Sequence, residues 1–227
     1  MKIVTLYSPS HKHMLDNYFL PSFPKDDRLE LKIHEAPQLA GETPVFNSKE
    51  WSSFMHIKAK ILQDELLSTP ENEIYGFLDV DIINVNNFHD FVRNTMGHFD
   101  VLCQNDSIYP TIPNLCTGVI FFRNTEACRN LLKAVNVYLD KFKNEQEALT
   151  FFASNNRRFA ELQNLRYQTF AFKNAYTYGS IGKGVWTGSE DFELPDKKDL
   201  YWVHANYCHH EKKEALLDKF KEKLEIL

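Results

Sequence analysis

The chain has 227 residues, a formal net charge of −5 and 43% hydrophobic residues. This length allows one medium-sized domain with a full core, without disulfides or a structural metal. The acidic balance argues against general nucleic-acid binding, which needs clustered Lys and Arg. The four cysteines form no Cys-x-x-Cys pair, which predicts free thiols in a reducing compartment. Because no segment resembles a signal peptide or a membrane span, we expect a soluble, cytoplasmic protein without a transmembrane segment.

The first half of the chain predicts strands that alternate with helices. Short apolar, β-prone runs predict the strands, and apolar residues at helical spacing predict the helices. An Asn47-x-x-Glu50 pattern is typical of a capping box, and Pro70 would end the helix that follows it. The expected elements are strands at 3–7 and 29–34, a helix from about 47 to 68, a strand at 76–83, a short helix at 88–96 and a strand at 100–104.

The second half continues the alternation. Thr125 and Asn144 are candidate helix caps. The glycine-rich segment 178–184 is typical of a mobile loop, and such loops often close over ligands. This organisation predicts an α/β fold, with one sheet covered by helices on both faces. The expected elements are a strand at 115–122, helices at 125–142 and 144–154, strands at 165–172 and 201–206, and an amphipathic helix from 211 to the end.

Two carboxylates one residue apart, Asp79 and Asp81, close the apolar run that starts at Gly76. Side chains alternate along a strand, so we expect both carboxylates to point the same way. Buried carboxylates on one side of a strand require a cation or hydrogen-bond donors in front of them. Two carboxylate ligands leave room for water and diphosphate oxygens, which suits Mg²⁺ or Mn²⁺. This pattern predicts an enzyme that acts on an activated phosphate compound.

Four motifs occur in a fixed order along the chain: Asp79-Val80-Asp81, then Thr117-Gly118 before an apolar strand, then Glu145-Gln146 at a helix start, and His204-x-Asn206 near the end. Together they resemble the nucleotide-diphospho-sugar transferases of the GT-A glycosyltransferase fold. The resemblance implies a Rossmann-like, mixed and mostly parallel sheet flanked by helices. It covers nearly the whole chain, so we expect one glycosyltransferase domain over residues 1–227, which can itself be part of a longer protein.

The resemblance also implies the ligands of the site. Asp79, Asp81 and His204 would hold a divalent cation, Mn²⁺ or Mg²⁺, and Asp79 would also contact the ribose. The donor would be a nucleotide-diphosphate sugar, with UDP the commonest nucleotide in similar enzymes. The acceptor would be a hydroxyl group of a glycan or of another molecule.

The remaining site residues follow from their positions in the family pattern. Tyr7 and Ser8 would hold the nucleobase, and Lys58, Lys60, Lys183, Lys212 and Lys213 are candidates for contact with the diphosphate. Lys183 ranks first among these lysines because its glycine neighbours would let backbone amides approach phosphate. For Lys58 and Lys60, a solvated side chain is the favoured expectation. The sugar or acceptor pocket is assigned to Thr117, Gly118, Gln146 and Trp186. The catalytic residues are assigned as Asp106, Glu145 and Gln146. Asp106 and Glu145 are the candidates for the carboxylate that would deprotonate the acceptor in an inverting enzyme.

The chain departs from the family pattern at three places. Glu145 replaces the usual aspartate, Cys116 replaces an asparagine before Thr-Gly, and 207–210 lack the usual glycine and lysine after the histidine. Two other functions remain open at this point. One is a haloacid dehalogenase-type phosphatase, which also uses an Asp-x-Asp motif at a strand end, although near the N-terminus. The other is a nucleotide- or sugar-binding α/β domain without catalytic activity.

Overall fold

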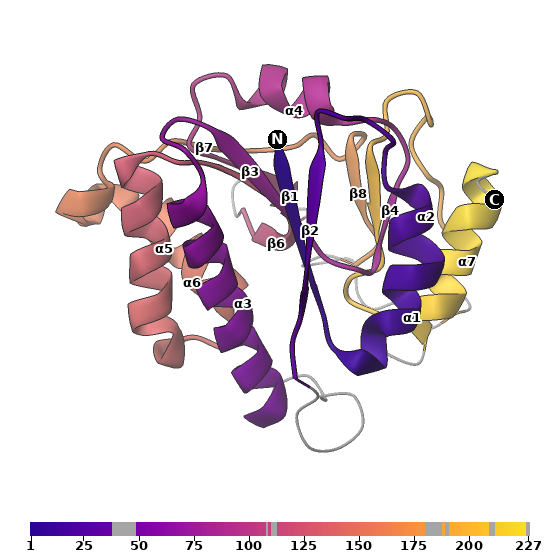
Figure 1. The fold of residues 1–227 in the computed structure, drawn as a ribbon, viewed down its shortest axis with the longest axis horizontal. Coiled ribbons are helices and arrows are strands. Elements are labelled where there is room, and N and C mark those ends of the chain that lie inside the picture. Colours follow the sequence, from indigo (N-terminus) through magenta and orange to yellow (C-terminus); the bar gives the residue numbers. More distant parts are fainter. Residues whose placement is uncertain are drawn as a thin grey trace.

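A computed structural model gives the fold of the chain (Figure 1). The structure describes residues 1–37, 49–107, 109, 113–179, 188, 191–208 and 212–225. The predicted Asn47 cap, most of the glycine-rich loop, Lys183 and Trp186 lie outside these residues. None of the helices within them is long and apolar enough to cross a membrane.

The centre of the fold is a six-stranded sheet with the order β2-β1-β3-β6-β5-β7. Strand β1 is parallel to β2 and β3, and β5 is parallel to β7. Strand β6 is antiparallel to both of its neighbours, so the sheet is mixed, as predicted. The strands are β1 (Lys2–Tyr7), β2 (Glu30–Glu35), β3 (Ile74–Leu78), β5 (Val101–Asn105), β6 (Leu115–Arg123) and β7 (Tyr167–Thr169).

A second, three-stranded sheet has the order β4-β9-β8. It consists of β4 (Ile82–Asn84), β8 (Ala175–Thr177) and β9 (Trp202–His204). The prediction of one continuous strand over 76–83 is therefore wrong. The chain leaves the large sheet after Leu78 and enters the small sheet at Ile82, so Asp79 and Asp81 lie on the connection between the sheets.

Helices cover both faces of the large sheet, as predicted. Helices α3 (Lys49–Ser68), α5 (Glu126–Tyr138) and α6 (Glu145–Ser154) lie together on one side. The other side carries the small sheet, α7 (Lys213–Leu224) and a helical segment over Pro9–Ser22 (Figure 1). Two separate hydrophobic clusters fill the spaces on the two sides. The shorter elements are α1 (Lys12–Met14), a π-helical turn (Leu15–Phe19), α2 (Leu20–Ser22), α4 (His89–Met96) and 3-10 turns at Pro9–His11, Leu139–Lys141, Asn156–Arg158 and Ala160–Leu162.

Two predicted helix caps are confirmed. The Thr125 hydroxyl accepts a hydrogen bond from the Cys128 N–H, and the Asn144 side chain accepts one from the Glu147 N–H at 2.7 Å. The helix predicted to reach residue 142 ends at Tyr138 and continues as a 3-10 turn. The strand predicted over 165–172 is limited to Tyr167–Thr169, the residues that lie in register with Val101, Leu102 and Cys103 of β5.

Glu65 of α3 ties the helix to the edge of the large sheet. Its carboxylate lies 2.7 Å from the Lys2 ammonium, 2.6 Å from Lys32 and 2.8 Å from the His34 ring, and the side chain is only 5% exposed. Burial opposes ionisation, but the hydrogen bonds from Lys2, Lys32 and His34 prevail and lower the pKa of Glu65 to about 2. The ionised carboxylate therefore stabilises the folded state.

We expect Glu65→Gln to lower the free energy of unfolding by roughly 2 kcal/mol at pH 7, because the substitution removes the buried ionised carboxylate that Lys2, Lys32 and His34 contact. A lowered pKa stabilises the fold above the unfolded-state pKa, so the difference from wild type should shrink as the pH falls from about 4.5 to about 2. Urea denaturation at several pH values measures it. Glu71→Gln, at a side chain that is 72% exposed, is the matched control and should have little effect.

Candidate functional site

The connection Asp79–Asp81 is held at both ends by backbone hydrogen bonds. The Asp79 N–H donates to the Gly118 carbonyl of β6 at 2.8 Å, and the Asp81 carbonyl accepts from the Ala205 N–H at 3.0 Å. Val80 between them is buried in the core. The backbone that carries the two carboxylates is therefore held in place where the chain passes from the large to the small sheet.

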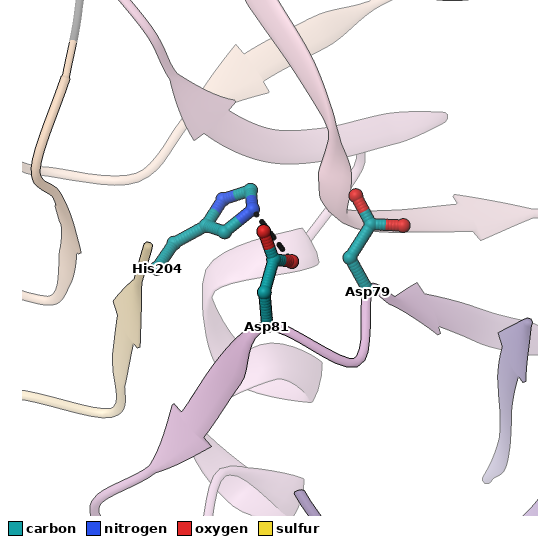
Figure 2. Close-up of side chains that lie close together, drawn as sticks. All are labelled: Asp79, Asp81 and His204. Carbon is teal, nitrogen blue, oxygen red and sulfur yellow. Dashed lines mark ion pairs between the residues drawn. The ribbon is translucent and has the colours of Figure 1, made fainter. Parts of the chain in front are cut away.

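His204 lies beside this connection because of strand register. It pairs with Ile82 across β4 and β9, and its Nε2 lies 3.3 Å from Asp81 Oδ1 (Figure 2). One ligand atom from each of Asp79, Asp81 and His204 lies within 4.8 Å of the others. Asp81 and His204 are buried, whereas the Asp79 side chain is 29% exposed and gives the cluster its open side.

Gly118 makes room for this cluster. Between β5 and β6 the register shifts at Cys103 and Gln104, and the extra residues of β6 form a bulge that contains Gly118. A Cβ atom on Gly118 would lie 2.4 Å from His204 Cε1 and 2.6 Å from Asp79 Oδ2. The absence of a side chain is therefore required for His204 and Asp79 to approach each other.

Two lysines neutralise the aspartates. Lys58 of α3 contacts both oxygens of Asp79, at 2.9 and 3.1 Å, and Lys213 at the start of α7 pairs with Asp81. Burial disfavours the charged form of each lysine, but the facing carboxylates prevail and raise the pKa of both. Lys213 and His204 in turn hold the pKa of the buried Asp81 carboxyl well below its usual value. The expectation that Lys58 is solvated is wrong, since it is only 4% exposed.

His204 is held from both ring nitrogens. Its Nδ1 lies 2.9 Å from Gln104 Oε1 and 3.7 Å from the Cys116 sulfur, while Nε2 faces Asp81. Burial alone would lower the pKa of His204, but the nearby aspartates, Asp81 first, raise it. Gln104 was not among the site residues predicted from the sequence. The signal for it was a polar residue in an apolar strand, close to the end of β5.

The start of α6 brings Glu145 and Gln146 to the same site. Glu145 is buried, and its Oε1 accepts a hydrogen bond from the Thr117 hydroxyl at 2.8 Å and lies 3.3 Å from the Lys58 ammonium. Its Oε2 has no hydrogen-bond partner among the described residues. The Gln146 amide lies between the Thr117 N–H, at 3.4 Å, and Asp106 Oδ2, at 3.3 Å. Thr117 therefore contacts both Glu145 and Gln146, and Gln146 also contacts Asp106.

Asp106 lies at the end of β5 and is 1% exposed. Burial raises the pKa of its carboxyl, although the positive charge of His204 and hydrogen bonds from neighbours such as Gln146 oppose this. Tyr207, whose hydroxyl accepts a hydrogen bond from the Asn114 amide at 3.2 Å, lies on the same side. A carboxyl group with a raised pKa is suited to accept a proton near neutral pH.

Tyr7 and Ser8 lie at the carboxyl end of β1, beside the carboxyl end of β3 that leads to Asp79. The Tyr7 hydroxyl donates to Glu35 at 2.6 Å, and this hydrogen bond raises the pKa of the phenol. The Ser8 hydroxyl lies 3.0 Å from both Ser10 Oγ and His11 Nδ1. Lys60 pairs with Asp64 on the surface, as expected for a solvated lysine, and Lys212 is exposed.

The cluster of Asp79, Asp81 and His204 fits a divalent metal ion. Two carboxylates and one imidazole are a suitable donor set for Mn²⁺. Their ligand atoms lie within 4.8 Å of one another, a Cβ on Gly118 would fill the space beside Asp79 and His204, and Asp79 keeps an exposed side for a further ligand.

Comparison with known proteins shows the family of the chain. A family model described as nucleotide-diphospho-sugar transferase matches residues 24–217, and the chain belongs to this family. This membership decides against a haloacid dehalogenase-type phosphatase and identifies the chain as a transferase for nucleotide-activated sugars. No curated protein matches the chain by sequence.

Solved structures of GT-A glycosyltransferases share the fold. A glycosyltransferase involved in the glycosylation of the major capsid of PBCV-1 is similar with a TM-score of 0.58 and 14% identity, over 96% of this chain and 98% of that chain. The galactosyltransferase LgtC, in complex with donor and acceptor sugar analogs, has a TM-score of 0.55 and 11% identity, over 100% and 96% of the two chains. The glycosyltransferase GlyE of Streptococcus pneumoniae TIGR4 has a TM-score of 0.57 and 12% identity, over 99% of this chain and 63% of that chain. The predicted GT-A fold is confirmed.

We expect Lys58→Met to destabilise the protein by about 3 kcal/mol, because it leaves the buried carboxylate of Glu145 and the partly exposed carboxylate of Asp79 without their cation. Lys60→Met, two residues away on the same helix at a side chain that is 71% exposed, should change the stability by less than about 0.5 kcal/mol. Chemical denaturation of the two variants measures the difference. Equal effects would show that Lys58 does not neutralise the site.

Gly118→Ala should cost about 1–3 kcal/mol, because the new methyl group would overlap His204 and Asp79. In a His204→Ala background one of the overlapping groups is removed, so the same substitution should cost less. A double-mutant cycle of unfolding free energies measures this coupling. An equal cost in both backgrounds would contradict the assigned contact.

Proposed function

We propose that this chain is a metal-dependent glycosyltransferase that moves a sugar from a UDP-sugar to a hydroxyl group of a glycan or another acceptor. The convergence of Asp79, Asp81 and His204 carries the proposal. It supplies a site for a divalent cation at the open edge of the sheet, in a family that uses nucleotide-diphosphate sugars. UDP is proposed because it is the commonest donor nucleotide in similar enzymes.

Asp79, Asp81 and His204 would hold Mn²⁺, or Mg²⁺ in its place. When bound, the cation would neutralise the charge that develops on the diphosphate as the bond to the sugar breaks. The task of the protein residues is to hold the donor in place and to exclude water from the anomeric carbon. Tyr7 and Ser8 at the end of β1 are proposed to contact the nucleobase, and Asp79 the ribose.

The lysines are proposed to contact the diphosphate. Lys58 and Lys213 are already fixed against Asp79 and Asp81, so both ammonium groups stand next to the proposed cation. A diphosphate in front of the aspartates would come within reach of these two positive charges. Contact between Lys183 and the diphosphate stays a prediction, because Lys183 lies outside the described residues.

Thr117, Gly118, Glu145 and Gln146 are proposed to line the pocket for the donor sugar or the acceptor. Glu145 Oε2 is buried without a partner among the described residues, which leaves it available to a sugar hydroxyl. Asp106 and Glu145 are the proposed catalytic carboxylates, and one of them would deprotonate the acceptor hydroxyl. Asp106 has the raised pKa that suits deprotonation of an acceptor hydroxyl, whereas Glu145 is held beside the Lys58 ammonium.

We further propose that residues 1–227 act as one glycosyltransferase domain, because both sheets contribute to the site. Asp79 follows a strand of the large sheet, and His204 ends a strand of the small sheet. Residence in the cytoplasm stays a prediction from the sequence.

The function is tested by thermal unfolding with nucleotide diphosphates, with and without Mn²⁺. A ligand that binds only the folded state at 100 times its dissociation constant stabilises it by about 2.7 kcal/mol. We expect UDP to raise the melting temperature in the presence of Mn²⁺, and Asp81→Asn to remove this shift. Release of UDP from UDP-sugars should depend on Mn²⁺ and fail in the same variant.

Asp196→Asn is the matched control, because Asp196 is exposed and pairs with Lys198 on the surface. Its response to UDP and Mn²⁺ should equal that of wild type. If no nucleotide stabilises the wild type, the donor site is wrong. Stabilisation by a nucleotide without any sugar release would favour a binding domain over an enzyme.

A further inference from the structure

Gln104 is a fully buried polar residue that connects the two sheets at the site. It lies on β5 of the large sheet at the register shift opposite the Gly118 bulge. Its Oε1 lies 2.9 Å from Nδ1 of His204 on β9, and its Nε2 donates to the carbonyl oxygen of Ala175 on β8 at 3.2 Å. The amide therefore contacts both parallel strands of the small sheet.

The Ala175 carbonyl fixes which end of the amide faces His204. A carbonyl oxygen only accepts hydrogen bonds, so the amide NH₂ group must point to Ala175 and the amide oxygen to the ring. That oxygen also only accepts, and therefore Nδ1 of His204 must carry a proton to bond with it. The hydrogen bond thus specifies the tautomer of the neutral ring, with the proton on Nδ1 and a lone pair on Nε2.

Without Gln104 the opposite tautomer would be favoured. Asp81 Oδ1, 3.3 Å from Nε2, is a strong acceptor that would attract the single ring proton to Nε2. The Cys116 sulfur, 3.7 Å from Nδ1, is a weaker hydrogen-bond acceptor than a carboxylate and would not keep the ring proton on Nδ1. A proton on Nε2 would block the ring atom that faces the two aspartates.

We propose that Gln104 is a positioning residue that holds the proton of His204 on Nδ1 and keeps the Nε2 lone pair available to a divalent cation. The inference rests on the proposed metal site for its function, but the tautomer it assigns is a property of the neutral His204 ring in the metal-free protein. Gln104 lies outside the sequence motifs and would support metal binding through His204.

The test compares Gln104→Leu, which removes the acceptor, with Gln104→Glu, which keeps an acceptor oxygen opposite Nδ1. Imidazole ¹⁵N chemical shifts of metal-free protein, at a pH where the ring is neutral, report the tautomer. The His204 signals are identified by their loss in His204→Gln. We expect the Nδ1–H form in wild type and in Gln104→Glu, and the Nε2–H form in Gln104→Leu.

Affinity for Mn²⁺ alone is measured by electron paramagnetic resonance of the free ion. Loss of the partner of a ligating histidine typically weakens metal binding 10–100-fold, so we expect this loss in Gln104→Leu and retention of binding in Gln104→Glu. Asn124→Leu is the control for burial. Asn124 is buried, and its amide donates to the Thr69 carbonyl. This variant should lose stability without a change in tautomer or Mn²⁺ affinity.

A folded Gln104→Leu protein that keeps the Nδ1–H tautomer, or that binds Mn²⁺ as wild type does, would overturn the proposal. So would an equal loss of Mn²⁺ affinity in Asn124→Leu, which would make the effect one of general stability. If the tautomer switches but wild type binds no Mn²⁺, the metal assignment of the proposed function fails, while the assignment of Gln104 to the tautomer is supported.

Discussion

The site depends on charge compensation at the crossing between the two sheets. Four carboxylates, on Asp79, Asp81, Asp106 and Glu145, gather where the protein interior meets the open edge of the large sheet, and three of them are buried. Isolated buried carboxylates would destabilise the folded state. Cations from distant segments offset this desolvation, since Lys58 comes from α3 and Lys213 from α7. The positions of these two helices are therefore linked to the charge of the site.

This arrangement explains why the aspartates can be stable without the proposed metal ion and donor. In the metal-free protein the ammonium groups and the His204 ring hold the carboxylates. A divalent cation would add positive charge next to both lysines, and a diphosphate would supply the negative charge that balances it. The charges of the site thus match the combination of a cation and a diphosphate better than either alone. Such a balance favours binding of the two together.

The sequence predicted the parts of the site that depend on local patterns. Four residues that the structure brings together belong to the ordered motifs of the sequence, as the resemblance implied: Asp79, Asp81, Gly118 and Glu145. The single strand over 76–83 was wrong because an apolar run gives no sign of where a chain changes sheets. The helical segment Pro9–Ser22 was missed, although Met14, Leu15, Tyr18 and Phe19 have helical spacing and are buried.

Contacts between distant residues could not be predicted in this way. Gln104 meets Ala175 and His204 across 71 and 100 residues of sequence, through a three-stranded sheet whose strands have three residues each. Strands this short carry too few residues for an alternating pattern to be recognised. The burial of Lys58 has the same origin, because a lysine on a helix is predicted to be solvated unless its carboxylate partners are known.

Two of the three departures from the family pattern, Cys116 and Glu145, are buried residues that contact other residues of the site. Cys116 accepts a hydrogen bond from the Gly118 N–H at 3.3 Å, so its sulfur holds the bulge that makes room for the cluster. Glu145 uses one oxygen for both Thr117 and Lys58, and the longer side chain leaves its second oxygen free of protein partners in the described part of the chain. These two residues contact the framework of the proposed sugar pocket more than the aspartates themselves. The substitutions can therefore alter which sugar fits while the charge balance at Asp79 and Asp81 is retained.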